Sequence, residues 1–215
     1  LLVDGIRLNH SAMRSGPNQY WSTVELFGSE RVEALRGTHG VLFGADAVGG
    51  IVNSLSSEPS YSNQKNYKSF ELLGRASSGE DSFGAGFSAE VSSPKWFAEI
   101  SHTERSFGDL DGGRKVERQK NTGYDVRGSQ ARLSRKLSVN ADLIFGVQKN
   151  FMDDVPRTHK TIDGLTWEGL SRGKEIWRRL DQERDLYYGR LAWEDIEGIA
   201  NSGKLTLSLH THDQE

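Results

Sequence analysis

Apolar and polar residues alternate with a period of two from about residue 68 to the end of the chain. The clearest runs are "DSFGAGFSAEVSS", "SVNADLIFGVQKN" and "GKLTLSLHTH". Alternation that persists over about ten residues predicts β-strands with one apolar face. In the first two runs the apolar face consists of Phe83, Ala85, Phe87, Ala89 and Val91, and then of Val139, Ala141, Leu143, Phe145 and Val147.

Weaker alternating runs fill the intervals between the clear ones. They are "SFELLGRAS", "KWFAEISHTERSF", "DVRGSQARLSR" and "RDLYYGRLAWED". Together with the clear runs they predict about seven strands in succession. A helix-like patch is expected within "GKEIWRRLDQERDLYYG", in a long loop from about residue 151 to residue 183.

The connections between the predicted strands differ in length. "SSGED", "SSPK" and "RKLS" are short, whereas the segment from 108 to 124 and the loop from about 151 to 183 are long and polar. After the first strand pair, tight turns and long polar loops alternate, and antiparallel barrels in membranes show this asymmetry, with short turns on one side and long loops on the other. Aromatic residues are expected near strand ends, as in an interfacial girdle, at Trp96, Phe107, Tyr187 and Trp193.

Two fold classes fit these strands. One is a membrane β-barrel whose polar strand faces line a wet or plugged lumen, since Glu, Asp, Lys, Arg and Gln occupy strand centres. The other is a soluble all-β module with an α/β cap that binds a ligand such as carbohydrate. Dependence on detergent separates the two, because only the barrel exposes its apolar face.

Residues 1 to 57 have a different character. "LLVDGIRLN" predicts a strand with a turn at Asp4-Gly5, and "GVLFGADAVGGIVNSL" predicts a turn, a short helix and a strand. We therefore predict three parts: a small α/β unit over residues 1–57, a polar linker over 58–67, and the barrel strands over 68–215.

Composition excludes several classes of protein. The net charge of −3 argues against nucleic acid as a partner. The chain has no cysteine, which excludes disulfide scaffolds and cysteine-based zinc sites. No apolar run has the length of a membrane-spanning helix. The chain begins without Met and reads as an internal fragment of a longer protein.

Three motifs in succession carry a family resemblance. "LLVDGIRLN", "SERVEALRG" and "GVLFGADAVGGIVN" resemble, in order and spacing, the second half of the plug domain of TonB-dependent outer-membrane receptors. The resemblance implies a fragment of a transmembrane antiparallel β-barrel, mainly β, with about seven strands preceded by part of a small α/β plug. In that family the glycine-rich segment threads the plug through the barrel. The implied plug turns are Gly37, Gly40, Gly44, Gly49 and Gly50.

The same resemblance implies a function. It predicts active uptake of a scarce ligand such as an iron-siderophore, haem or cobalamin across an outer membrane. The implied partners are outer-membrane lipid and a TonB-type inner-membrane energy-coupling complex, which would act through a segment upstream of this chain. A signalling receptor and a truncated, inactive gene product remain as alternatives within the family. No motif of an enzyme appears, so we expect neither catalysis nor a resident cofactor.

Arg36 is the first site residue that the resemblance points to, as an anchor pairing with carboxylates of the barrel wall. Glu33 is its nearest expected local partner. A buried guanidinium needs such a partner, whereas the alternative is an exposed ion pair of little energetic value.

The second is a plug loop that would rise towards the ligand. Its candidate contacts are Arg14, Asn18, Gln19 and Tyr20, with His10 as a candidate ligand of haem iron. A packed loop shaped by Gly16 and Pro17 is the alternative. His210 and His212 share a strand face at a spacing that suits a metal, but they lack a third ligand, so we predict no metal site.

Overall fold

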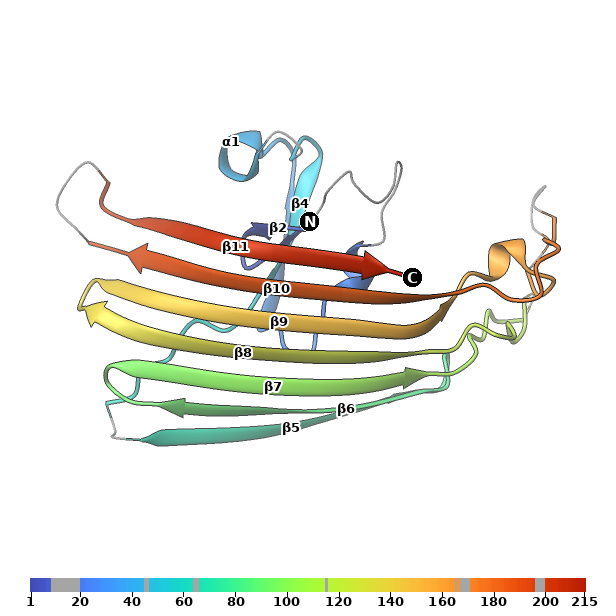
Figure 1. The fold of residues 1–215 in the computed structure, drawn as a ribbon, viewed down its shortest axis with the longest axis horizontal. Coiled ribbons are helices and arrows are strands. Elements are labelled where there is room, and N and C mark those ends of the chain that lie inside the picture. The colour runs from blue at the N-terminus through green and yellow to red at the C-terminus, as the bar shows by residue number, and fades with distance from the viewer. Residues whose placement is uncertain are drawn as a thin grey trace.

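The computed structural model describes residues 1–8, 20–44, 47–63, 66–114, 116–164, 166, 171–195 and 200–215. These residues form two sheets, one of seven strands and one of four (Figure 1). The small sheet lies against one face of the large one. Among the described residues, no helix has the length and apolar character needed to cross a membrane.

The large sheet is an antiparallel meander in which every strand pairs with its neighbours in sequence. The prediction of about seven strands is confirmed. Tight turns follow β5, β6 and β8, whereas long loops follow β7 and β9. The strands are β5 (Tyr67–Ser77), β6 (Ser82–Ser92), β7 (Trp96–Phe107), β8 (Tyr124–Ser138), β9 (Ala141–Pro156), β10 (Arg179–Trp193) and β11 (Gly203–Gln214).

Three expectations about these strands were wrong in detail. "RKLS" is not a turn, because β8 continues to Ser138 and the turn falls at Val139, whose side chain is 90% exposed. The helix-like patch is not a helix, since β10 begins at Arg179 and pairs with β9 throughout. Tyr187 is consequently in the middle of β10 and not near its end. In each case pairing with a neighbouring strand extends the ladder beyond what the local pattern indicates.

One face of the large sheet is a continuous apolar surface, which we call the apolar belt. Strand pairing aligns Ala98, Leu133, Phe145, Gly189 and Leu207 in a single row across it. Leu133 is 51% exposed, Phe145 52% and Leu207 75%. Soluble monomers rarely expose a continuous apolar patch of more than a few hundred square ångströms. The wall of a membrane barrel, by contrast, exposes an apolar surface to lipid over its whole width.

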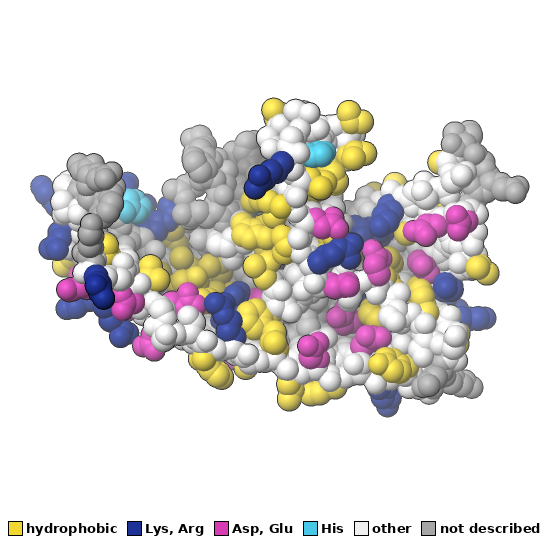
Figure 2. Space-filling view, turned by 180° about the vertical axis from the view of Figure 1, so that it is seen from behind, with side chains coloured by type: hydrophobic (Ala, Val, Ile, Leu, Met, Phe, Trp, Pro, Cys, Tyr) yellow, Lys and Arg dark blue, Asp and Glu magenta, His cyan; other side chains and the backbone are white. Residues whose placement is uncertain are grey.

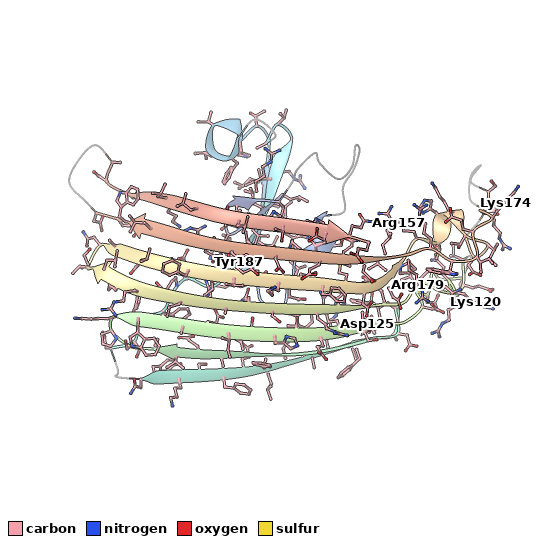
Figure 3. The ribbon with its side chains drawn as sticks, in the orientation of Figure 1. Lys120, Asp125, Arg157, Lys174, Arg179 and Tyr187 are labelled. Carbon is pink, nitrogen blue, oxygen red and sulfur yellow. The ribbon has the colours of Figure 1, made fainter. Side chains whose placement is uncertain are left out.

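The apolar belt has defined edges. Trp96 and Trp193 lie at the strand ends away from the two long loops. Towards the other end the belt stops at Tyr187, which lies on the sheet in Figure 3. Just beyond Tyr187, the Nζ of Lys149 binds the Oδ2 of Asp185 at 2.6 Å. Aromatic residues followed by charges mark the boundary between hydrocarbon and headgroups in membrane barrels.

The small sheet has the strand order β2-β1-β4-β3. Strands β1 and β4 are parallel, and the other two pairs are antiparallel. Alternation in β1 divides its side chains, so that Leu2 packs in the interior of the small sheet and Val3 packs against the large one. The elements are β1 (Leu2–Val3), β2 (Ile6–Arg7), η1 (Tyr20–Thr23), β3 (Arg31–Arg36), α1 (Gly40–Phe43) and β4 (Gly50–Leu55).

Tight turns hold this small unit together. Asp4 and Gly5 both have positive φ, at 50° and 76°, which gives the two-residue hairpin turn expected from the sequence. Gly37, Gly44 and Gly50 also have positive φ. Gly40 begins α1, and Gly49 directly precedes β4. The predicted linker, 58–67, falls between the end of β4 and the start of β5 except for Tyr67, which is the first residue of β5. The three-part division stays a prediction.

Replacing Gly50 by alanine is expected to destabilise the small sheet by about 1–3 kcal/mol, the usual cost of a strained backbone conformation. Gly50 has a φ of 145°, and a Cβ there would lie 2.5 Å from the carbonyl oxygen of Leu35. Gly49→Ala is the matched control, because a Cβ at Gly49 meets nothing within 4 Å. Denaturant unfolding of both variants tests this, and equal stability would contradict it.

Candidate functional site: the interface between the small sheet and the wall

The small sheet packs on the face of the large sheet opposite the apolar belt. Figure 2 views the molecule from behind and shows acidic and basic side chains among polar ones on this side. A buried apolar cluster joins the two sheets, with the small unit contributing Val3, Leu8 and Val24 and the wall contributing Ile144, Leu186 and Tyr188. Around this cluster the contacts are polar, and four groups of them define the site.

Asp4 is the first group. Its Oδ2 accepts hydrogen bonds from the Tyr188 hydroxyl at 3.2 Å and from Gln148 Nε2 at 3.3 Å, both on the wall. Its Oδ1 accepts from the backbone N–H of Ser56 at 2.8 Å. The guanidinium of Arg190 donates to its carbonyl oxygen. Only 6% of Asp4 is exposed, so these bonds replace water around a buried carboxylate.

The wall is shaped to bring Tyr188 to Asp4. A Cβ at Gly146 would lie 2.3 Å from the Tyr188 ring, so only glycine leaves room for that ring on the strand beside it. Burial makes the hydroxyl require a partner, and Asp4 supplies it.

Glu25 is the second group. Its Oε2 lies 3.0 Å from Arg105 Nη2, and both side chains are largely buried, at 13% and 15% exposed. Nearby, Gln130 Nε2 donates to the carbonyl oxygen of Gly28 at 2.9 Å. Among the described residues, the pair of Glu25 and Arg105 is the one ion pair that joins the small unit to the wall.

Arg184 is the third group and is 98% buried, with 2% exposed. Its Nε donates to the carbonyl oxygen of Thr23 at 2.9 Å, and its Nη2 donates to Gln148 Oε1 at 3.3 Å. Its Nη1 is buried without a hydrogen-bond partner among the described residues. Burying a guanidinium that only neutral groups bind costs desolvation free energy. Arg184 is therefore expected to reduce the stability of this part of the wall.

The segment after β4 is the fourth group and is attached to the wall at two points. Arg132 pairs with Glu99 on the wall, and the same guanidinium donates to the carbonyl and the hydroxyl of Ser57. Further along, the hydroxyl of Tyr61 lies 2.6 Å from Ser134 Oγ and donates to Asp142 Oδ1 at 2.8 Å. We call the contacts of Ser57 and Tyr61 the linker clamp.

The linker clamp is expected to weaken in strong alkali. Burial raises the pKa of the Tyr61 phenol from 10.0 to about 12. The folded state therefore keeps the proton that the unfolded chain releases, so this contribution is intact below pH 10.0 and is lost as the pH rises towards about 12. The free energy of unfolding, measured across this pH range, should fall more steeply in the parent protein than in Tyr61→Phe. Parallel curves of this free energy against pH would contradict the prediction.

Arg36 and Glu33 do not pair with each other. Glu33 Oε1 binds Arg31 Nε at 2.9 Å, and both side chains are about half exposed, at 45% and 49%. Residues two apart on a strand share a face, whereas Arg36 is three positions from Glu33 and projects from the other face. Arg36 is exposed, and none of the described carboxylates pairs with it. Its role as an anchor to the wall stays a prediction.

The predicted ligand loop cannot be placed. His10, Arg14, Asn18 and Gln19 lie outside the described residues, and Tyr20 begins η1 with its side chain also outside them. His210 and His212 lie on β11, as expected. Three carboxylates, Asp153, Asp154 and Asp181, lie within 4.8 Å of one another, and Arg179 pairs with Asp154 at 2.9 Å.

A pocket lies at the end of the sheet where the two long loops meet. Asn121 of the first loop donates from Nδ2 to Asp163 of the second at 2.7 Å. The pocket has a volume of about 460 Å³, and Trp177, Ile176 and Arg178 are among the residues that line it. Figure 3 shows Lys120, Arg157, Lys174 and Arg179 gathered at this end.

Sequence reasoning missed most of the interface. Glu25, Arg105 and Arg184 were not singled out, although the two arginines have a local signal. The two arginines occupy polar positions of alternating strands, which face away from the apolar belt. Asp4 was identified only as a turn residue. What the alternation could not give is which of these charges meet.

Comparison with known proteins agrees with this geometry. Residues 1–51 match the model of the TonB-dependent receptor plug domain. This segment is therefore a plug domain of the TonB-dependent receptor family. The chain's first sheet is part of the plug, and its second sheet is part of the barrel wall that surrounds a plug in that fold. The predicted resemblance is thereby confirmed.

Individual relatives are distant and longer. The vitamin B12 transporter BtuB of Photobacterium profundum is 32% identical over 56 residues, and the match covers 26% of this chain and 9% of BtuB. The siderophore receptor PirA of Acinetobacter baumannii superposes with a TM-score of 0.59 at 16% identity, over 99% of this chain and 31% of PirA.

A mutant of the ferric enterobactin receptor PfeA from Pseudomonas aeruginosa, in complex with enterobactin, superposes with a TM-score of 0.56 at 17% identity. The match covers 85% of this chain and 28% of that receptor. At these identities the two structures establish the fold alone. The chain therefore spans less than a third of the length of these two solved receptors.

Proposed function

We propose that the full-length protein is a TonB-dependent transporter of the outer membrane. It takes up a scarce ligand such as an iron-siderophore, haem or cobalamin, and a TonB-type energy-coupling complex drives the plug to rearrange. The observation that carries the proposal is the plug–wall interface: a small domain held by polar and ionic bonds on the inner face of a wall whose outer face is the apolar belt.

The nature of that interface supports a plug that moves. An obligate core is mainly apolar, whereas here Asp4, Glu25 and the linker clamp supply much of the contact. Polar bonds of this kind exchange with water at little net cost, because each broken bond is replaced by one to water. A plug held in this way stays closed at rest and separates from the wall under an applied force.

An iron chelate with negative charge is the ligand that we favour. The pocket between the long loops combines the Trp177 indole with the guanidinium of Arg178. Lys120, Arg157 and Lys174 lie at the same end, and the lining also holds the carboxylates of Asp154 and Asp163. Indole and guanidinium groups suit a planar aromatic ligand that carries negative charge. The names of PirA and PfeA point to siderophores, and that of BtuB points to cobalamin.

The test is uptake by the full-length receptor in a host that lacks its own receptors. Ferric enterobactin, haemin and vitamin B12 are supplied separately, in cells with and without a functional TonB protein. We expect uptake of one of them, and only where TonB is present. Binding without uptake would instead support a signalling receptor, and neither binding nor uptake of any of the three would contradict the proposal.

A soluble binding module is the second candidate that the sequence allowed. The apolar belt argues against it, because a water-soluble protein would expose Leu133, Phe145 and Leu207 together on one surface. A full-length protein that stays in solution without detergent would favour the soluble module over the transporter.

A further inference from the structure

We propose that Glu25 is the ionic latch of the plug. In the closed state its carboxylate sits in a notch of the wall, which we call the Glu25 notch, formed by Thr103, Arg105 and Gly128. It must leave this notch for ligand to pass. The inference rests on the proposed transport function, and it assigns to Glu25 and Arg105 the retaining role that the sequence led us to expect of Arg36.

Gly128 creates the space of the notch. A Cβ at this position would lie 2.6 Å from Glu25 Cγ and 2.9 Å from both Glu25 Oε2 and Thr103 Oγ1. Any other residue would push Glu25 away from the wall. Gly128 is on β8, and β7 supplies the other two notch residues, Thr103 and Arg105. The wall therefore has an opening where the plug inserts the Glu25 carboxylate.

Both oxygens of Glu25 are engaged. Oε2 accepts a hydrogen bond of 3.0 Å from Nη2 of Arg105, which belongs to the wall. Oε1 accepts a hydrogen bond of 2.8 Å from the backbone N–H of Phe27, which belongs to the plug. The bond to Phe27 fixes the carboxylate in the direction of Arg105. Arg105 is held in turn between the rings of Phe27 and Phe107, with its Cζ 5.2 Å and 5.6 Å from their centroids.

The notch is also poised to open. Thr103 Oγ1 and Arg105 Nε are buried beside Glu25 and lack hydrogen-bond partners among the described residues. A cavity of about 10 Å³ adjoins them, lined by Glu25, Thr103 and Gly128 among others. This is about the volume that one water molecule requires, and water entering there would satisfy these atoms. Water at this point would compete for the ion pair, so separation under force would not leave bare charges.

A disulfide across the notch tests whether it must open. This chain has no cysteine, so Glu25→Cys with Gly128→Cys introduces one defined crosslink in the full-length receptor. Ser88→Cys with Ser101→Cys is the control, because these residues are directly opposite each other on β6 and β7 and both belong to the wall. The probe is whichever of ferric enterobactin, haemin or vitamin B12 the parent receptor takes up.

We expect the oxidised notch pair to abolish uptake, reduction to restore it, and the wall pair to have no effect. Uptake that continues with the notch disulfide intact would overturn the proposal. Electrophoresis without reductant establishes that each crosslink has formed, and heat-modifiable migration establishes that each barrel has folded.

A second measurement is independent of any ligand. Glu25→Gln, Arg105→Gln and the double variant are expressed as full-length receptors, and the sensitivity of the cells to vancomycin is measured. We expect each single variant to raise sensitivity several-fold by loosening the plug, and the double variant to add little, because the two residues act as one pair. Unchanged sensitivity, or effects that add, would overturn the latch. If the parent takes up none of the probes, transport fails while this measurement still decides the latch.

Discussion

Replacing Leu133 by arginine is expected to destabilise the full-length receptor in lipid by about 2–4 kcal/mol, the cost of a charged residue on the lipid face of a barrel near the membrane midplane. Leu133 is in the central row of the apolar belt, between Ala98 and Phe145, and is 51% exposed. The free energy of unfolding in lipid vesicles, measured by urea titration, gives the difference directly.

Ser88→Arg is the matched control for this substitution. Ser88 is on the opposite face of the wall and lines a pocket with Glu71, Glu90 and Glu99. An arginine there meets carboxylates and water, so we expect little loss of stability. If Leu133→Arg were as harmless as Ser88→Arg, the apolar belt would not face lipid and the soluble module would be favoured, since an exposed leucine in water tolerates arginine.

Replacing Arg132 by alanine is expected to cost about 3–5 kcal/mol, the range seen when one partner of a buried ion pair is removed. Its side chain is 6% exposed and that of its partner Glu99 is 14% exposed. The substitution leaves the Glu99 carboxylate without its cation and frees the carbonyl and hydroxyl of Ser57 from the wall. Loss of the linker clamp at Ser57 should also expose the segment between the plug and β5 to proteases.

Two controls separate the parts of this effect. Arg135→Ala removes an exposed arginine from the same strand, and we expect a change within about 0.5 kcal/mol. Ser57→Ala removes one hydrogen-bonding hydroxyl and should cost about 1 kcal/mol. Denaturant unfolding and limited proteolysis of the three variants are compared. Equal losses for Arg132→Ala and Arg135→Ala would show that the buried pair contributes nothing to retaining the linker.

The predicted anchor and the observed interface differ in which side carries the positive charge. The resemblance led us to expect a plug arginine, Arg36, bound by wall carboxylates. The described contacts instead set a plug carboxylate, Glu25, against a wall arginine, Arg105. The two arrangements are compatible, because Arg36 is exposed in this chain and no described residue pairs with it. The vancomycin sensitivity of cells that express an Arg36→Ala variant should therefore be compared with that of cells that express Arg105→Gln.

The sequence by itself determined the elements of this protein. Period-two alternation specified which side of each strand would be apolar, and this assignment holds across the apolar belt, because alternation depends only on the geometry of a single strand. Asp4-Gly5 specified its turn for the same local reason, since few residue pairs tolerate two successive positive φ values. The three plug motifs also carried the family.

Only the tertiary structure decided how those elements meet. The notch depends on Glu25, Arg105 and Gly128, which are distant in the chain and are brought together by strand register. Asp4 reaches Tyr188 across 184 positions for the same reason. Alternation shows that a charge faces the lumen, but which partner it finds depends on pairing and packing between segments that no local pattern encodes.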